Sequence, residues 1–154
     1  MERDRAALFT VASDPLIWEQ HPAHNRWKPD VFDAFFDQAL TEGGGLVAED
    51  IPTGAVIGSS RYSVQRAETG EVEIGWTFLA RRHWGDGTNA EMKRLMLDHA
   101  FTAFDAAIFV IGADNRRSRI AIERTGAALT ERRLNAVMAG RSLEHVIYRL
   151  ARQA

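Results

Sequence analysis

The stretch from Glu71 to Asp105 is the part of the sequence that most restricts the fold. It begins with a strict alternation of apolar and polar or small residues, which predicts a half-buried strand. The apolar side of this strand carries Val72, Ile74, Trp76 and Phe78. A helical repeat of apolar residues follows and runs to Asp105, with charged residues on its other side. The sequence therefore predicts a strand, a turn and a core-facing helix in direct succession.

The turn in this stretch contains Gly85 and Gly87, and Thr88 and Glu91 after it have the spacing of a capping box. Glycines allow the backbone to approach a ligand closely, and the free amides of a helix start favour an anion. The turn is therefore either a phosphate cradle or an ordinary strand-to-helix connection, and a short glycine motif alone does not decide. A P-loop motif is absent from the sequence. Ala90 replaces the third glycine of a dinucleotide motif, which disfavours nicotinamide cofactors.

The segment Arg82-His83-Trp84-Gly85-Asp86-Gly87 resembles the Arg/Gln-x-x-Gly-x-Gly/Ala acetyl-CoA motif of the GNAT N-acetyltransferase superfamily. Glu73-Ile74-Gly75-Trp76, Asn115-x-x-Ser118 and Gly126 are similar to the branch related to ribosomal-protein alanine acetyltransferases. The resemblance covers roughly residues 6 to 150. It implies a single GNAT domain over residues 1–154 with acetyl-CoA as its cosubstrate.

The resemblance also implies a cofactor site built mainly from backbone groups. The pantetheine of acetyl-CoA would lie between two splayed parallel strands, held by Phe78, Leu79 and Ala80. Amides of the turn would hold the pyrophosphate, and Asn115 would contact the cofactor. The arginines at 116–119 would either reach the adenosine phosphate or simply form a solvated helix start. The implied turn residues are Arg82, Gly85, Asp86, Gly87 and Thr88.

Acetyl transfer to an amine requires an uncharged nucleophile and a proton for the departing thiolate. Glu73 is the candidate general base, acting directly or through water, since it lies on the polar side of the predicted strand. Alternatively, it binds the acceptor's ammonium group or pairs with Arg61. Many related enzymes have a proton-donating tyrosine seven residues after the asparagine, where this chain has Ile122. Ser118 is the nearest replacement, although a serine there can also cap the helix.

The remaining pattern predicts an α+β domain with a mixed, mostly antiparallel sheet flanked by helices. Short helices are expected over 4–12 and from Asp14-Pro15 through Gln20, and a longer one starts at Pro29. Expected strands are 45–50, 55–65, 107–112, 128–135 and 143–150, with 107–112 parallel to the strand that begins at Glu71. This is the element order of the GNAT fold, but the strand that usually precedes the first helix is missing. An open sheet edge of this kind predicts a homodimer.

Composition excludes several other classes of protein. The chain has 154 residues, 45% of them hydrophobic and 26% charged, with a net charge of -2, which gives no general attraction to nucleic acid. It has no cysteine, so disulfides and a cysteine nucleophile are excluded. His21-x-x-His24 lacks a third ligand, and no metal site is predicted. Without a signal peptide or an apolar run of roughly 18 residues, we expect a cytoplasmic protein that does not bind membranes.

The sequence thus predicts an N-acetyltransferase that moves acetyl from acetyl-CoA to a primary amine by direct transfer in a ternary complex. The acceptor stays open between a protein N-terminus, an amino acid or peptide, and a small amine. Trp18, Trp27 and the nearby histidines are expected to line the acceptor pocket. The alternative is a non-catalytic, acyl-CoA-binding regulatory protein of the same fold. The missing tyrosine supports this alternative.

Overall fold

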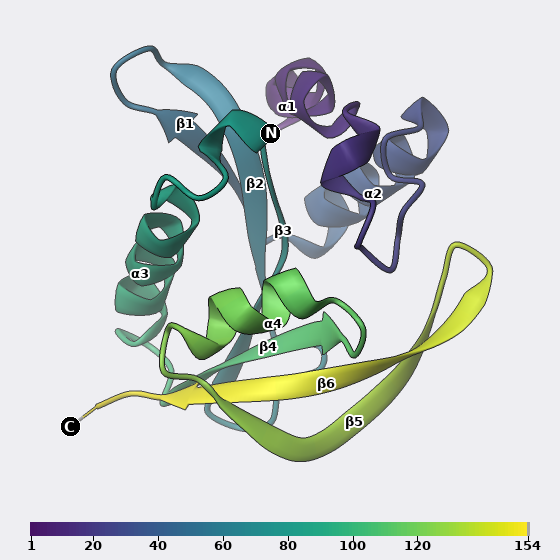
Figure 1. Cartoon of the computed structure of the whole chain (residues 1–154). Helices are drawn as coiled ribbons and strands as arrows, with labels where there is room; N and C mark the ends of the chain where they lie inside the picture. The colour runs from purple at the N-terminus through teal and green to yellow at the C-terminus, as the bar shows by residue number, and fades with distance from the viewer. Residues whose placement is uncertain (154) are drawn as a thin grey trace.

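The computed structural model describes residues 1–153 as a six-stranded mixed sheet with helices on both of its faces (Figure 1). The helices are α1 (Arg5–Ala12), α2 (Pro29–Glu42), α3 (Thr88–Ala100) and α4 (Arg116–Glu123). The strands are β1 (Gly45–Asp50), β2 (Ala55–Ser63), β3 (Glu71–Leu79), β4 (Ala106–Gly112), β5 (Ala128–Met138) and β6 (Arg141–Ala151). Their order in the sheet is β1-β2-β3-β4-β6-β5, and only the β3–β4 pair is parallel. The predicted crossover to a parallel strand is therefore confirmed.

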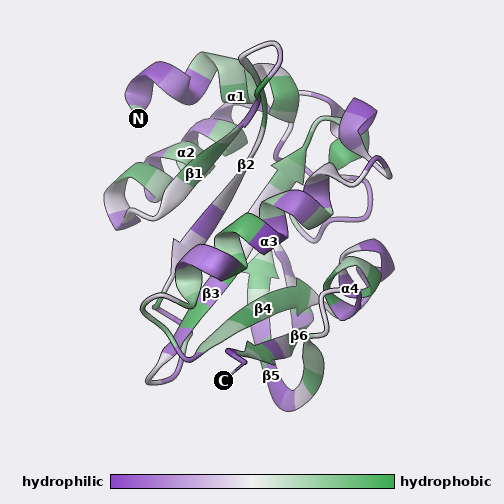
Figure 2. Ribbon diagram, turned by 90° about the vertical axis from the view of Figure 1, so that its left-hand side faces the viewer, coloured by the Kyte–Doolittle hydropathy of each residue, from purple (hydrophilic) through white to green (hydrophobic). Residues whose placement is uncertain are grey.

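Each face of the sheet has its own apolar core. α3 and α4 cover a core that includes Val72 and Ile74 of β3, Met96 of α3 and Phe109 of β4. α1 and α2 cover a second core that includes Phe78 at the end of β3. The ribbon of α3 alternates between hydrophobic and hydrophilic residues, as expected for a helix with one buried side (Figure 2). Burial on both faces of β4 explains the continuous apolar character of that strand.

The alternation predicted for β3 is broken at Trp76. This residue has a φ of +53°, a left-handed conformation that is strained for a large side chain. The register between β2 and β3 shifts at the same point. As a result Ile74 faces the core under α3, whereas Phe78 faces the core under α1 and α2. The prediction that both residues share one face with Trp76 was wrong because the bulge turns the strand over.

The parallel pair β3–β4 is short. The parallel pairs join Glu71, Val72 and Glu73 to Ala106, Ala107 and Ile108. In the described residues, β3 and β4 do not pair with each other beyond this point. Beyond this point β3 and β4 diverge, which leaves the facing edges of their second halves free of each other. The splayed strands expected from the resemblance are therefore present.

Several predicted boundaries need correction. The helix start at Thr88 has no capping box, because Gly87 is the N-cap and the carboxylate of Asp86 accepts the Thr88 N–H at 2.9 Å. The helix ends at Ala100, five residues before Asp105. The helix expected through Gln20 is a single 3-10 turn, Pro15–Ile17, which Asp14 caps.

The two ends of the chain add further detail. In residues 1–153 no strand precedes α1, so the missing first strand is confirmed for that range, and β1 forms one edge of the sheet. The final hairpin is longer than predicted, since β5 and β6 have 11 residues each. The homodimer stays a prediction. Within the described chain, no helix has the length and apolar character needed to cross a membrane.

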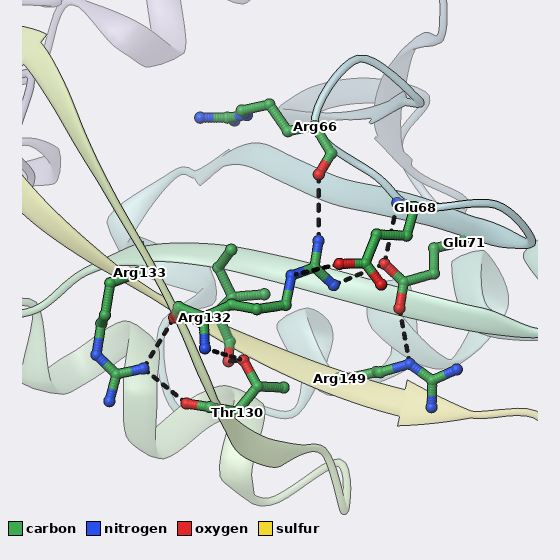
Figure 3. Close-up of polar contacts among 8 residues, drawn as sticks. Arg66, Glu68, Glu71, Thr130, Arg132, Arg133 and Arg149 are labelled. Atoms are coloured by element: carbon green, nitrogen blue, oxygen red, sulfur yellow. Dashed lines mark hydrogen bonds and ion pairs between the residues drawn. The ribbon is translucent and has the colours of Figure 1, made fainter.

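A buried carboxylate ties the final hairpin to the start of β3 (Figure 3). Glu71 accepts hydrogen bonds from Arg132 of β5 at 2.8 Å and from Arg149 of β6 at 2.7 Å. Arg132 also forms an ion pair with Glu68 and donates to the backbone carbonyl of Arg66. Burial favours the neutral form of Glu71, but the two arginines outweigh it and lower the pKa of this carboxyl. The cluster links the start of β3, where it pairs with β4, to both strands of the final hairpin.

Glu71→Gln tests this connection. The variant keeps the shape of the side chain but loses the charge, and we expect the free energy of unfolding at neutral pH to fall by about 1–3 kcal/mol. Since the pKa of Glu71 is lower in the folded state, its contribution is present above its ordinary value of 4.5 and is lost as the pH falls through the folded-state value. Urea denaturation of both proteins across acidic pH should therefore show the difference shrinking.

Asp98→Asn is the matched control, because Asp98 pairs with Arg94 on the exposed side of α3. This change should cost less than about 0.5 kcal/mol. Equal losses for the two variants would show that the Glu71 cluster does not hold the hairpin.

Candidate active site

A cleft of about 610 Å³ opens where β3 and β4 diverge. Its walls are the second halves of these strands, the turn before α3, the first turns of α4, and the segment from Ile17 to Arg26. Met138 at the tip of the final hairpin closes one end. The cleft reaches both faces of the sheet, since residues from both apolar cores line it. It brings together the glycine turn, Glu73, Asn115 and Ser118, which are far apart in the sequence.

The glycine turn has the backbone that a phosphate cradle requires. Gly85 and Gly87 have φ values of +82° and +97°, and no atom lies within 4 Å of the space that a side chain would occupy at either position. A side chain there would enter the cleft and strain the backbone. Thr88 already has its N–H bonded to Asp86, and this hydrogen bond lowers the pKa of the Asp86 carboxyl. An incoming pyrophosphate would have to compete with this carboxylate for the start of α3.

The predicted pantetheine contacts differ among the three residues. Both backbone groups of Ala80 are bonded within the protein, its N–H to Ile57 and its carbonyl to the N–H of His83. The backbone groups of neighbouring residues in a strand point to opposite edges. Since Ala80 bonds β2, the preceding residue, Leu79, turns its backbone away from β2 and toward the cleft. Its carbonyl accepts the indole N–H of Trp84 at 3.1 Å. Phe78 lines the cleft but buries its ring under α1 and α2. Of these residues, Leu79 is the one placed to meet a cofactor through its backbone.

The start of α4 contributes the other predicted residues. Asn115 is buried, and its side-chain oxygen accepts the N–H of Ser118 at 3.2 Å, which caps the helix. Ser118 and Ile122 both line the cleft, so the position expected for the tyrosine is apolar. Arg117 stacks on Trp84 with 4.1 Å between its guanidinium carbon and the ring centre.

Two further arginines of the sequence analysis lie apart from the cleft lining. Arg82 is exposed and donates to the ring of His83. Arg119 bonds the hydroxyl of Tyr148, which in turn donates to Glu123. This tyrosine is in the core under α3 and α4 and has a structural role there.

Glu73, the predicted base, is almost completely buried, with 1% of its surface exposed. Both of its carboxylate oxygens accept hydrogen bonds from Arg66, at 2.9 and 2.5 Å. Burial raises the pKa of Glu73, while Arg66 and Arg61 act in the opposite direction. The partner is therefore Arg66, where the sequence suggested Arg61. A carboxylate engaged on both oxygens is held in place but has less freedom to accept a proton.

His145 is a second candidate base that the sequence analysis missed. It lines the cleft from β6 and is 2% exposed. Its Nδ1–H donates to the carbonyl of Leu143 at 3.1 Å, which leaves Nε2 to accept a proton. Burial lowers the pKa of His145, so the ring is neutral at pH 7. The available signal was a lone histidine directly before the apolar residues Val146 and Ile147 of the last strand.

Lys93 is a buried amine in the wall of the cleft, and the sequence analysis placed it wrongly on the solvated side of α3. It is 5% exposed, and its ammonium nitrogen donates to the hydroxyl of Thr77 at 2.6 Å and of Ser60 at 3.4 Å. Burial lowers the pKa of Lys93 to about 7. Thr77 and Ser60 are also bonded to each other, at 2.8 Å, directly beside the bulge at Trp76.

Comparison with known proteins agrees with this geometry. A family model described as an acetyltransferase (GNAT) domain matches residues 1–128. The chain is also 31% identical over 132 residues to the uncharacterised protein YkkB of Bacillus subtilis (strain 168), covering 81% of this chain and 76% of that protein. The chain therefore belongs to the GNAT acetyltransferase family. Members of this family use acetyl-CoA, the cosubstrate that the sequence predicted.

Solved structures confirm the GNAT fold. A GNAT-family protein from Chromobacterium violaceum superposes with a TM-score of 0.81 at 22% identity, covering 97% of this chain and 78% of that one. The protein yncA from Salmonella typhimurium, crystallised with its cofactor acetyl-CoA, has a TM-score of 0.68 at 20% identity, covering 98% of this chain and 90% of that one. The narrower resemblance to ribosomal-protein alanine acetyltransferases stays a prediction.

Lys93→Met tests the buried amine. Between pH 7 and the ordinary lysine pKa of 10.5 the unfolded chain binds more protons than the folded one, so the stability of the natural protein rises with pH. The slope can reach about 1.4 kcal/mol per pH unit. The variant should lack this rise and be at least as stable at pH 7, as measured by urea denaturation from pH 7 to 10. Lys28→Met, at an exposed lysine, should keep it. Equal slopes for Lys93→Met and the natural protein would contradict a buried, uncharged lysine.

Proposed function

We propose that this chain is an acetyl-CoA-dependent N-acetyltransferase that transfers acetyl to a primary amine directly, within a ternary complex. The single observation that carries the proposal is the cleft between the diverging strands, with the open glycine turn at one wall and buried titratable groups at another. Holding the amine and the thioester side by side in such a cleft can supply about 7–11 kcal/mol of the barrier.

The cofactor side of the cleft comprises the turn, Leu79 and the start of α4. The free amides near Gly85 and Gly87 suit a pyrophosphate, and the backbone of Leu79 suits the pantetheine. Acetyl-CoA supplies the activated acyl group and a thiolate leaving group. Arg117 lies at the same wall and offers a cation near the turn. These contacts depend mostly on backbone shape.

The acceptor amine has to lose a proton before or during attack. We propose His145 as the group that takes it, because its Nε2 is free and its ring is neutral, whereas both oxygens of Glu73 hold Arg66. In this scheme Glu73 positions Arg66 and Trp76 at the cleft. Ser118 stays the candidate for protonating the thiolate, since its hydroxyl lines the cleft next to Asn115.

A non-catalytic protein that binds acyl-CoA is the second candidate function. The observation that favours it is the apolar Ile122, which lies in the cleft wall where related enzymes have a tyrosine. Such a protein would bind acetyl-CoA but release no thiol with any amine.

Gly85→Trp tests the cradle. Isothermal titration of acetyl-CoA should show saturable binding to the natural protein and at least a 10-fold weaker affinity for the variant, because the indole would fill the space kept open by Gly85. Gly54→Trp is a matched control: Gly54 also has a positive φ, of +67°, and no neighbour within 4 Å, but it lies in the β1–β2 turn outside the cleft lining. If the control binds as poorly as Gly85→Trp, backbone strain and not the cradle explains the loss. Absence of binding by the natural protein would sink the proposal.

His145→Asn tests the base, since the asparagine amide can still donate to Leu143. We expect kcat/KM to fall by about 10²–10⁴-fold. In the natural enzyme kcat/KM should fall only when the pH drops below 6.5, because burial lowers the pKa of His145 from that value. The variant should lack this acidic limb of the pH profile. His99→Gln, on the exposed side of α3, is the control. If Glu73→Gln instead removes the limb and His145→Asn does not, Glu73 is the base.

A further inference from the structure

Arginine side chains and aromatic rings alternate along the α1/α2 side of the cleft. We call this row the arginine–aromatic stack, and its members in spatial order are Arg66, Trp76, Arg61, Phe35, Arg26 and Trp18. The distances between successive guanidinium carbons and ring centres are 5.0, 4.6, 5.5, 4.4 and 5.6 Å. Each contact is within the range of a cation–π interaction. The stack leads from Glu73 at the strand divergence to the loop that follows Trp18.

The charges of the three arginines are not balanced in the same way. Arg66 is paired with Glu73, and Arg61 is paired with Glu42 of α2 at 3.1 Å. Arg26 has no carboxylate partner in the part of the chain that the structure describes. Burial, followed by the charge of Arg61, lowers the pKa of Arg26 to about 10, so the guanidinium still carries its charge at pH 7. Arg26 is part-buried, and its guanidinium has no hydrogen bond among the described residues, so an unpaired positive charge is open to the cleft.

Arg26 also differs in its orientation toward the cleft. Of the three arginines, Arg26 and Arg66 line the cleft, and Arg66 is already bound to Glu73. The ring of Phe35 lies under the guanidinium of Arg26. The N–H groups of a guanidinium lie in its plane, so stacking on a ring leaves them free to donate to an anion. A carboxylate can accept two of these hydrogen bonds side by side.

The candidate base lies at the same end of the cleft. His21 is packed edge-on against Trp18, and the pKa of His21 is lowered to about 3 by burial and then by the charges of Arg26, His145 and Arg117. Arg26 and His145 line the same cleft, so one small molecule bound there can meet both groups. His21 itself is neutral, with Nδ1 accepting the N–H of Ala23, so it does not balance Arg26.

We infer that Arg26 binds a carboxylate on the amine acceptor, so that the substrate is a small amine carrying its own carboxylate, as a free amino acid does. The inference rests on the proposed function, because it assigns the acceptor of the same transfer. The carboxylate pairs with Arg26, and the amine points toward His145 and the thioester. A protein N-terminus lacks this carboxylate and would leave Arg26 unpaired. Pairing of this kind gives specificity because an analogue without the charged group leaves the arginine unsatisfied.

The test uses pairs of amines that differ only in the carboxylate: a panel of free amino acids and the corresponding amino-acid amides. Thiol release from acetyl-CoA is measured for the natural protein, Arg26→Met and Arg26→Lys. The natural protein should prefer each acid over its amide, and Arg26→Met should lose about 10–10³-fold in kcat/KM for the acids only. Arg26→Lys keeps the charge and the packing but loses the planar fork, so an intermediate loss is expected. Arg26→Lys also replaces Arg26→Met in the test if Arg26→Met does not fold.

Titration of acetyl-CoA into the same variants separates this inference from the proposed function. Affinity for acetyl-CoA should be unchanged in Arg26→Met, and Arg94→Met, on the exposed side of α3, should change neither readout. Weaker acetyl-CoA binding would assign Arg26 to the cofactor and overturn the inference. Equal rates for acids and amides, unaffected by Arg26→Met, would overturn it as well.

Failure of the proposed function has a different signature, namely acetyl-CoA binding without turnover of any amine. Arg26 is then tested by equilibrium binding of the amino acids to the protein saturated with CoA. Binding by the natural protein that Arg26→Met lacks would support the anion site, and absence of binding by both would overturn it.

Discussion

The left-handed backbone of Trp76 is the constraint on which the rest of the site depends. It turns β3 over, so that the residues before it serve the core under α3 and the residues after it serve the core under α1 and α2. The pairing of β3 with β4 ends at Glu73, three residues before Trp76, so the bulge lies in the part of β3 that has already left β4 and lines the cleft. The strain of one residue is offset by Arg61 and Arg66, whose guanidinium groups lie against its ring.

The charged side chains around the bulge at Trp76 are compensated in different ways. Glu73 and Arg66 neutralise each other beside it, and the Glu71 cluster holds the backbone of Arg66 through Arg132. On the α3 side the cation is Lys93, which has hydroxyl partners and a lowered pKa, so the burial cost is reduced by losing the proton. An arginine cannot do this at neutral pH. Arg26 therefore differs from Lys93, which can lose its proton, and from Arg61 and Arg66, which are paired with carboxylates.

The sequence was sufficient for elements whose signals are local. The Gly85–Gly87 turn, the parallel crossover to β4 and the final hairpin all follow from residue spacing, and the family motif predicted acetyl-CoA as the cosubstrate. The kink at Trp76 was missed because tryptophan has no preference for a left-handed backbone, and tertiary contacts impose it. Lys93 stands between Met92 and Arg94 in a helix with several charged residues, so nothing local distinguishes it from an exposed lysine. His145 and Arg26 matter only through neighbours that are distant along the chain.

This difference explains why the cofactor site is easier to predict from the sequence than the acceptor site. The proposed cofactor side depends mainly on backbone groups between Leu79 and Thr88, and the glycine spacing of this segment is visible in the sequence. The acceptor side is assembled from the segment Ile17–Arg26, the bulge of β3 and the strand β6, which meet only after folding. A segment of this kind can change its side chains without disturbing either apolar core. Proteins that share this fold can therefore differ in the charges at such a segment, because a fold does not determine the site that it carries. Among the described residues of this cleft, Arg26 is a cation without a carboxylate partner, which is why the proposed acceptor carries a carboxylate.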